Sequence, residues 1–324
     1  MSGRLVHTGQ VVLDLVMRVP GLPARGGDVL AHGPELTPGG GFNVMAAAAR
    51  SGARVVYAGA HGTGPLSDRA RAALAAEGIA VAQEPVPDAD LGMVVALVDD
   101  DGERTFVTGT GAEGRLHPGQ LAGVPVTADD LVYVTGYSLM HPANRAALLP
   151  WLPTVPARIL FDPGPLAAHL PRSTLTHLWP TFDIVSCNAS EAHALAHTAI
   201  NETATEAAAD TGGAAGAIEA AAESIAARLA PAAAVVVREG ASGCLLTVAG
   251  HTRRVPGFPV DPVDTNGAGD THCGVLAAEL LRGADLETAC RRANAAASLS
   301  VRHPGPSTAP HRPEINALLA TPRP

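Results

Sequence analysis

The sequence predicts a three-layer α/β fold with a mostly parallel central sheet. Short apolar runs rich in β-branched residues alternate with alanine-rich runs of helical spacing, as in repeated strand–helix units. At 324 residues the chain can bury a large core, and we expect a single domain over residues 1–324. The expected strands cover residues 5–13, 54–58, 131–135, 158–162, 184–187 and 233–237, and the expected helices cover residues 43–51, 66–77, 142–151, 189–197, 217–229, 271–282 and 285–302.

Three segments interrupt this alternation. Residues 15–37 place two prolines and the pair Gly26-Gly27 between short β-like pieces. Residues 91–109 have the pattern of a β-hairpin that turns at Asp101-Gly102. Residues 198–230 are rich in alanine and threonine, which indicates a surface loop followed by a helix without an assigned function.

The composition excludes several classes of function. All 22 basic residues are arginine, and the absence of lysine rules out a Walker A site and Schiff-base chemistry. The net charge of −9 argues against nucleic acid and anionic membrane surfaces as partners. The four cysteines are far apart and predict reduced thiols, and we see neither a signal peptide nor a membrane-spanning segment. We therefore expect a cytoplasmic protein.

The most informative motif is the glycine-rich turn Asp264-Thr265-Asn266-Gly267-Ala268-Gly269-Asp270, which leads directly into a helix. The free N–H groups and the dipole at a helix N-terminus bind anions. A carboxylate beside such a site suggests a base next to a phosphoryl group, as in a kinase that acts on alcohols. Alternatively, Asp270 only caps the helix and complements its dipole. In either case we expect the helix N-terminus to lower the pKa of Asp270.

This motif resembles the C-terminal signature of the ribokinase-like (PfkB) family of carbohydrate and nucleoside kinases. The resemblance implies that Asp270 takes the proton from a substrate hydroxyl. It also implies that the N–H groups of Gly267, Ala268 and Gly269 form an anion hole for the γ-phosphoryl group. The fold that it implies is a three-layer αβα ribokinase-like fold with a small β-sheet lid. Residues 15–37 and 91–109 would form that lid, which closes over the substrate and builds a homodimer.

Residues 38–54 resemble the N-terminal signature of the same family, with glycines, an asparagine and an alanine-rich helix. Asn43 can donate to and accept from sugar hydroxyls, although an N-cap is an equal reading of that residue alone. Asp14, at the end of an apolar strand, is costly to bury without a partner. Where ribokinases carry a glutamate that contacts the sugar, this chain has Tyr137. The substrate-binding residues implied are Asp14, Gly39, Gly40, Gly41, Asn43 and Tyr137.

The remaining matches concern a nucleotide and metal ions. Asn188 and Glu191 resemble the family's Asn-x-x-Glu motif, which arranges Mg²⁺ and its waters around ATP, although a helix capping box has nearly the same form. The resemblance further implies nucleotide contacts from Asn188, Arg238, Gly240, Gly243 and Asn294. The residues that could surround K⁺ are Asp264, Asn266, Ser300, His303 and Gly305.

We therefore expect an ATP-dependent kinase that phosphorylates a hydroxyl of a small sugar or sugar derivative. A nucleoside kinase is the alternative on the same fold, with Met93, Phe106 and Tyr137 as candidates to cover a base. A third hypothesis is a non-catalytic sugar or nucleotide sensor, but a sensor has no need of a base such as Asp270. The sequence leaves open which substrate and hydroxyl are used, whether K⁺ activates, and the oligomeric state.

Overall fold

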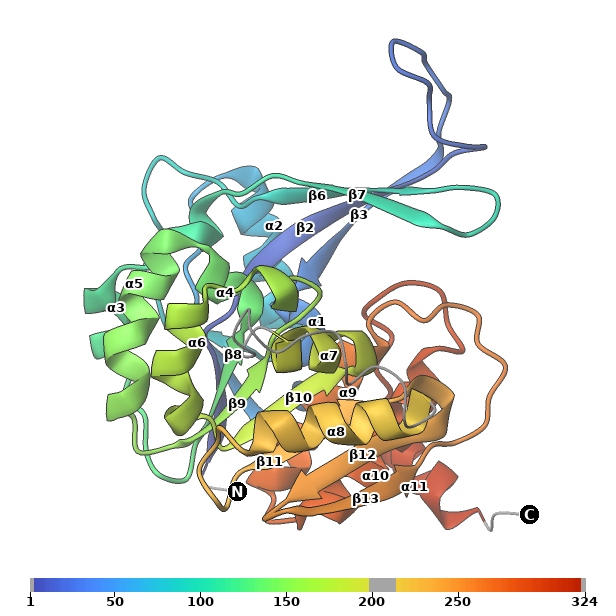
Figure 1. Ribbon diagram of the computed structural model, residues 1–324. Helices are drawn as coiled ribbons and strands as arrows, with labels where there is room; N and C mark the ends of the chain where they lie inside the picture. The colour runs from blue at the N-terminus through green and yellow to red at the C-terminus, as the bar shows by residue number, and fades with distance from the viewer. Residues whose placement is uncertain (1–2, 198–213, 322–324) are drawn as a thin grey trace.

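The computed structural model describes residues 3–197 and 214–321, and the loop expected at 198–213 lies outside the described residues. Its main body is a nine-stranded sheet in the order β13-β12-β11-β10-β9-β8-β1-β4-β5, with helices on both faces (Figure 1). The pairs from β11 to β5 are all parallel, whereas β12 and β13 form an antiparallel extension at one edge. The predicted three-layer α/β fold with a mostly parallel sheet is thus confirmed.

The strands of the main sheet are β1 (Arg4–His7), β4 (Arg54–Tyr57), β5 (Ala80–Val81), β8 (Leu131–Thr135), β9 (Arg158–Asp162), β10 (Ile184–Asn188), β11 (Ala234–Arg238), β12 (Gly243–Val248) and β13 (His251–Pro256). Alternate residues of the central strands point to opposite faces, and each face has its own buried cluster. In β8, for example, Tyr133 belongs to one cluster and Val134 to the other. Because both faces are covered, these strands are almost entirely apolar.

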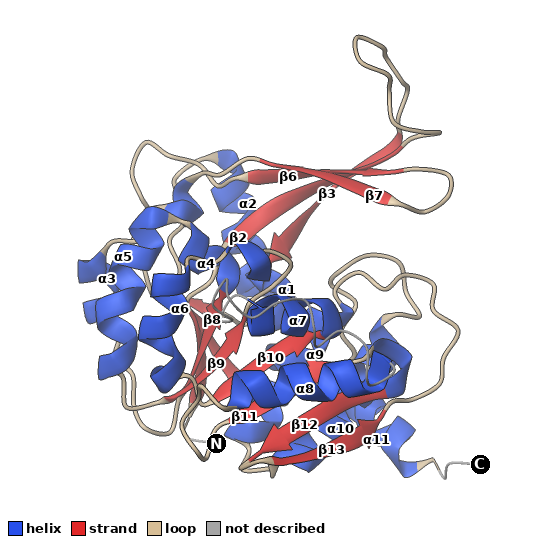
Figure 2. Ribbon diagram, viewed as in Figure 1, coloured by secondary structure: helices blue, strands red, loops and turns tan. Residues whose placement is uncertain are grey.

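Two groups of helices cover the two faces. One contains α1 (Gly41–Arg50), α2 (Pro65–Ala76), α9 (Ala268–Leu281), α10 (Leu286–Ser300) and α11 (Arg312–Ala320). The other contains α3 (Pro118–Ala122), α4 (Gly136–Met140), α5 (Pro142–Trp151), α6 (Arg172–Leu178), α7 (Ala189–His197) and α8 (Ala214–Ala226). Figure 2 shows α7 and α8 in front of the sheet and α10 behind it. All four cysteines are buried as free thiols in these layers, and no helix among the described residues is long and apolar enough to span a bilayer.

A second, smaller sheet projects from the main body in the order β3-β2-β6-β7. Its strands are β2 (Val11–Arg18), β3 (His32–Gly40), β6 (Met93–Val98) and β7 (Arg104–Thr108). The hairpin predicted at 91–109 is present as β6 and β7, and Gly102 in its turn has the positive φ of 80° that favours glycine. This sheet is the small sheet that the sequence predicts, although its first strand begins at Val11 rather than at residue 15.

The single strand predicted over residues 5–13 is wrong, because the chain leaves the main sheet after His7. Residues 8–10 form a tight crossing in which the N–H of Thr8 still reaches Tyr133 O at 3.0 Å. At Gly9 a Cβ atom would lie 2.5 Å from the His7 ring, so only glycine fits the turn. The interpretation of Asp14 as the end of a buried strand is also wrong, because Asp14 lies inside β2 of the small sheet.

Helices α1 and α9 pack unusually closely at Gly274. A Cβ atom on this residue would lie 2.3 Å from Val44 O and 2.7 Å from Ala47 Cβ, both on α1. Helix α9 is buried from Thr271 to Leu280, so no side of it can move outward without disturbing the core. The contact therefore fixes the spacing between the N-terminal halves of α1 and α9.

We expect Gly274→Ala to lower the free energy of unfolding by about 1–3 kcal/mol, because the added methyl group forces α1 and α9 apart. The measurement is urea denaturation followed by circular dichroism. Gly216→Ala, at an exposed position of α8, is the matched control, since open space surrounds that position and alanine favours a helix by up to about 1 kcal/mol. Equal stability of Gly274→Ala and the parent protein would contradict this account of the packing.

Candidate active site

The turn before α9 requires glycine at position 267. This residue is the N-cap of the helix with φ 74° and ψ 3°, and a Cβ atom on it would lie 2.0 Å from Pro306 O. The helix begins at Ala268, three residues earlier than the predicted start at 271, because the N–H of Thr271 already donates to Gly267 O. Ala268 donates to Thr265 O at 3.3 Å, whereas the N–H groups of Gly269 and Asp270 belong to the first turn and have no partner within the helix.

These N–H groups border a cavity of about 660 Å³. The predicted site residues that line it are Asn188, Glu191, Arg238, Gly240, Gly243, Asn266, Gly267, Ala268, Gly269, Asp270 and Asn294. They come from strands β10 and β11, from helices α7, α9 and α10, and from the turns beside them. The cavity thus joins the residues that the resemblance assigns to the nucleotide with the base and the anion hole.

Asp270 connects this cavity to the small sheet. Its Oδ2 accepts a hydrogen bond of 3.2 Å from Nδ2 of Asn43, which lies on α1 directly after β3. The Oδ1 atom of Asn43 is buried and has no partner in the described structure. A buried amide oxygen without a donor is costly, so this atom is suited to accept from a hydroxyl group of a ligand.

The expectation that the helix N-terminus lowers the pKa of Asp270 is wrong. Burial raises the pKa of Asp270 to about 7, and the nearby carboxylates of Asp162 and Asp14 add to this rise. The hydrogen bond from Asn43 and the charge of Arg238 act in the opposite direction without cancelling it. Desolvation therefore outweighs the hydrogen bond from Asn43 and the charge of Arg238, and it gives Asp270 a pKa suited to a general base near neutral pH.

Asp14 lies near enough to Asp270 for its charge to act on that carboxylate. Burial raises the pKa of Asp14 to about 6. Gly39 faces it across the β2–β3 pair, and a Cβ atom on Gly39 would lie 2.0 Å from Oδ2 of Asp14. The glycine thus leaves room for this carboxylate rather than for a ligand. Gly40 has the positive φ of 60° that glycine adopts freely.

The other two predicted substrate residues differ in role. A Cβ atom on Gly41 would lie 2.2 Å from Cε1 of His7, so this glycine is required by the packing of a buried histidine. Tyr137, near the start of α4, is half-buried, and burial followed by the charge of Asp270 raises the pKa of its phenol. Tyr137 therefore lies close enough to Asp270 and Asp14 for their charges to act on its phenol.

Asn188 and Glu191 form a helix capping box, which is the alternative interpretation of the Asn-x-x-Glu motif. Oδ1 of Asn188 accepts from the N–H of Glu191, and Oε2 of Glu191 accepts from the N–H of Asn188, each at 2.8 Å. Oε2 of Glu191 also lies 3.3 Å from Nη2 of Arg238. The motif thus caps α7 and faces the cavity at the same time.

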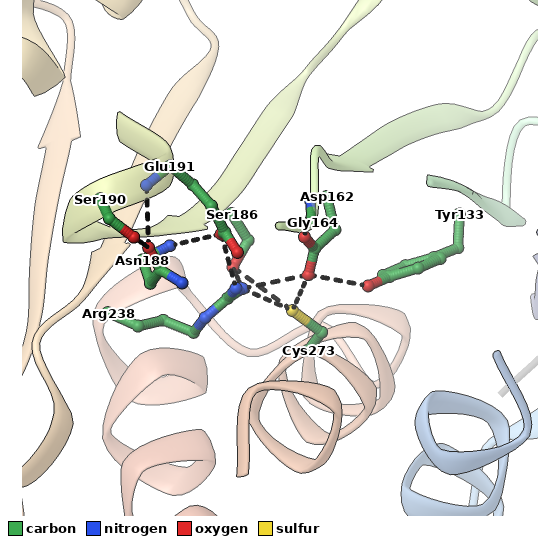
Figure 3. Close-up of polar contacts among 9 residues, drawn as sticks. All are labelled: Tyr133, Asp162, Gly164, Ser186, Asn188, Ser190, Glu191, Arg238 and Cys273. Atoms are coloured by element: carbon green, nitrogen blue, oxygen red, sulfur yellow. Dashed lines mark hydrogen bonds and ion pairs between the residues drawn. The ribbon is translucent and has the colours of Figure 1, made fainter. Parts of the chain in front are cut away.

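Arg238 is the centre of a buried polar cluster that includes a residue the sequence analysis missed (Figure 3). Its Nη1 donates to Oδ2 of Asp162 at 3.2 Å and to Oγ of Ser186 at 2.8 Å. Asp162 closes β9, lines the cavity and also accepts from the hydroxyl of Tyr133 at 3.2 Å. The signal for Asp162 was present, because an aspartate ends the apolar run of the expected strand 158–162 at the carboxyl edge of the sheet.

Gly240, Gly243 and Asn294 line the cavity together with two more residues that the sequence analysis missed, His272 and Phe258. Nε2 of His272 lies 3.1 Å from Oδ1 of Asn294, and Nδ2 of Asn294 donates to Val255 O at 2.9 Å. The side chain of Asn294 is thus used within the protein, while the residue still borders the cavity.

The five residues that the resemblance associates with K⁺ lie in two segments, 264–266 and 300–305, that are joined by hydrogen bonds of Asp264 with Gly305 and Val301. Oδ1 of Asp264 accepts from the N–H of Asn266, and Oδ2 accepts from the N–H of Gly305. The N–H of His303 donates to Ser300 O. The side chain of Arg104, from the small sheet, also reaches the carboxylate of Asp264.

Comparison with known proteins agrees with this geometry. A model of the pfkB family of carbohydrate kinases matches residues 2–312. The chain belongs to the PfkB family. It is 32% identical to the uncharacterized sugar kinase YegV of Escherichia coli over 99% of both chains, and 29% identical to a ribokinase of Bacillus subtilis over 96% of this chain and 98% of the relative.

Comparison with solved structures gives the same result for the fold. A crystal structure of a ribokinase from Thermotoga maritima superposes with a TM-score of 0.79 at 23% identity, covering 98% of this chain and 99% of the other. The ribokinase-like fold is therefore confirmed. As a PfkB family member the chain is a sugar or nucleoside kinase.

Replacement of Arg238 by methionine tests the buried cluster. We expect Arg238→Met to lower the free energy of unfolding by about 3 kcal/mol or more, because it leaves Asp162 and Glu191 buried without their cation. The loss should be larger at neutral than at acidic pH, since protonation removes the uncompensated charges.

The matched control is Arg253→Met, which breaks an exposed ion pair with Glu287 and should cost less than about 1 kcal/mol. Denaturation by urea at two pH values measures both variants. An Arg238→Met protein no less stable than the Arg253→Met protein would contradict the assignment.

Proposed function

We propose that the chain transfers the γ-phosphoryl group of ATP to a hydroxyl of a small sugar or sugar derivative, with Asp270 as the general base. The observation that carries this proposal is the position of one carboxylate. Asp270 lies in the first turn of α9 beside N–H groups that have no helical partner, and it is hydrogen-bonded to a buried asparagine with a free acceptor. A base and an anion-binding site in the same helical turn suit proton removal during phosphoryl transfer.

On the acceptor side, the substrate hydroxyl would lie against Asp270. Asp14 and Oδ1 of Asn43 would accept hydrogen bonds from neighbouring hydroxyl groups. These contacts hold the reacting oxygen in place, and in phosphoryl transfer such positioning provides much of the rate. When Asp270 takes the proton, the oxygen is free to attack along the line of the bond that breaks.

On the donor side, the cavity beyond Asp270 would hold ATP. The N–H groups at the start of α9 would stabilise the equatorial oxygens of the transferred group as charge develops there. Gly240 and Gly243 form a turn with positive φ values of 57° and 97°, over which a nucleotide can lie without meeting side chains. The adenine would reach the end lined by His272 and Asn294.

A magnesium ion would be held here mainly by phosphate oxygens and water. Within the described residues, no group of three or more histidine, cysteine and acidic side chains converges as a direct metal site. Glu191 and Asn188 present oxygen atoms to the cavity and are the residues that would hold the hydrated ion. When bound, Mg²⁺ neutralises charge on the phosphate oxygens.

The small sheet would act as a lid over the acceptor site and as a dimer surface. On its outer strand β7, Phe106 and Val107 are 54% and 65% exposed, and Leu30, in the loop between β2 and β3, is 80% exposed. Such residues on one small sheet suit burial against a second copy of the chain. A lid also excludes water, which would otherwise compete with the substrate hydroxyl. The need for ATP is consistent with the expected cytoplasmic location.

The test is release of ADP from MgATP over a panel of pentoses, hexoses, sugar acids and nucleosides. We expect turnover with one class of sugar, and Asp270→Asn should lose several orders of magnitude in kcat while it still binds nucleotide. Turnover with nucleosides alone would favour the nucleoside kinase, and ATP binding without turnover would favour the sensor. Activity of Asp270→Asn above about a tenth of the parent value would overturn the base assignment.

The pKa of Asp270 predicts the pH dependence. Because the base must be ionised, kcat/KM should fall about tenfold per pH unit below pH 7 and level off above it. Removal of the Asn43 amide takes away a hydrogen bond that favours the ionised form, so Asn43→Ala should move this acidic limb to higher pH.

The control for this shift is Asn316→Ala, which removes an exposed amide on α11. The measurement is kcat/KM from pH 5 to 9 for the three proteins, a range chosen to bracket the pKa of about 7. A limb that stays in place in Asn43→Ala would show that Asp270 is not the group that titrates.

A further inference from the structure

One ion pair joins the small sheet to the loop that carries the anion hole. Arg104 is the first residue of β7, and its Nη2 lies 2.5 Å from Oδ1 of Asp264 in the loop before α9. The two side chains are only 28% and 13% exposed. The attraction between them is therefore screened less than in an ion pair on the open surface. In Figure 1 the β6–β7 hairpin extends over the side of the molecule where this loop lies.

Asp264 holds the anion-hole loop in shape. Its two oxygens accept from the N–H groups of Asn266 at 2.8 Å and Gly305 at 2.9 Å. Asn266 immediately precedes the N-cap Gly267, and Pro306, which follows Gly305, packs its carbonyl against that glycine. The carboxylate thus fixes both walls of the turn from which α9 starts.

Arg104 and the acceptor site belong to the same sheet. Strand β7 pairs with β6, and β6 pairs in parallel with β2, where Asp14 lies opposite Val94. Because one sheet carries both residues, the contact of Arg104 with Asp264 and the position of Asp14 near Asp270 are set together.

A potassium ion does not fit beside Asp264 while Arg104 is there. The carboxylate of Asp264 already accepts hydrogen bonds from two N–H groups, and it is paired with the full positive charge of the Arg104 guanidinium. A second cation at the same oxygens would be repelled by the first. Ser300 O, another of the expected ligands, accepts from the N–H of His303 and from Oγ1 of Thr308.

We propose that Arg104 takes the place of a monovalent cation at Asp264, so that the small sheet itself orders the anion hole when it closes. Arg104 is a positioning residue in this arrangement, because it acts through Asp264 and touches no substrate. The inference rests on the proposed kinase function for its turnover test and not for its stability test. It identifies one charge that couples the acceptor sheet to the site of phosphoryl transfer.

The turnover test compares the parent protein with Arg104→Ala, at equal ionic strength in potassium chloride and in tetramethylammonium chloride. We expect the parent to have the same kcat in both salts. Arg104→Ala should lose about tenfold or more in kcat in tetramethylammonium, with a smaller change in KM, because the anion hole is misplaced. Potassium or free guanidinium should restore part of this loss. Arg18→Ala, which removes another arginine from the same sheet, is the matched control and should resemble the parent.

The stability test needs no substrate. Thermal unfolding in the two salts should show a higher Tm in potassium for Arg104→Ala and no difference for the parent, because only the variant has a vacant cation position. If the parent shows no turnover with any substrate, the proposed function fails while this measurement still decides the present inference. Arg104→Gln, which keeps much of the side-chain length, replaces Arg104→Ala if circular dichroism shows that the alanine variant is unfolded.

Three results would overturn the proposal. The first is a parent protein that requires potassium for turnover or gains as much Tm from it as the variant does. The second is an Arg104→Ala protein that matches the parent in both salts. The third is a loss in Arg104→Ala that neither potassium nor guanidinium changes, which would give Arg104 a role in packing alone.

Discussion

The site depends on a single buried guanidinium. Asp162, Glu191 and Asp270 all converge on the carboxyl edge of the sheet, where three carboxylates would repel one another in a poorly hydrated space. Arg238 lies between the first two and also lowers the pKa of the third. Because a guanidinium cannot lose its proton at any accessible pH, the net charge of this cluster changes with pH through its carboxylates. The edge can therefore keep an ionised carboxylate, which is able to accept a proton, and still accommodate a polyanion beside it.

The two halves of the site are built in different ways. The proposed nucleotide side consists of main-chain turns and helix ends on the main sheet, so its shape follows from the core. The proposed acceptor side places Asp14 on a projecting sheet, and Asn43, at the start of α1, is hydrogen-bonded to Asp270. A rigid donor site and a movable acceptor site suit a family whose members share one phosphoryl donor and differ in the acceptor.

Much of the fold could be predicted from the sequence because the strands are short and apolar on both faces. The strand at 158–162 and the helix at 142–151 agree with the structure at both ends. The crossing at residues 8–10 could not be seen, since apolar residues flank it on both sides and the tertiary contact that accompanies the turn, from Thr8 to Tyr133 O, joins residues far apart in the sequence. Asp162 was missed because its strand was read as core alone. The raised pKa of Asp270 could not be predicted from the sequence. The position of Asp270 at a helix start is visible there, whereas its burial depends on the assembled cavity.

The order of the main sheet has a consequence for synthesis on the ribosome. Strand β1 lies between β4 and β8, so one of its edges can pair early and the other must wait until residues 131–135 have emerged. Strands β2, β3, β6 and β7 all lie in the intervening stretch and can form their own sheet in the meantime. The nascent chain therefore carries an unpaired parallel edge for much of its translation, which is a template for association with other chains. Arrival of β8 closes that edge, and it also connects the halves of the molecule that carry the acceptor and the donor.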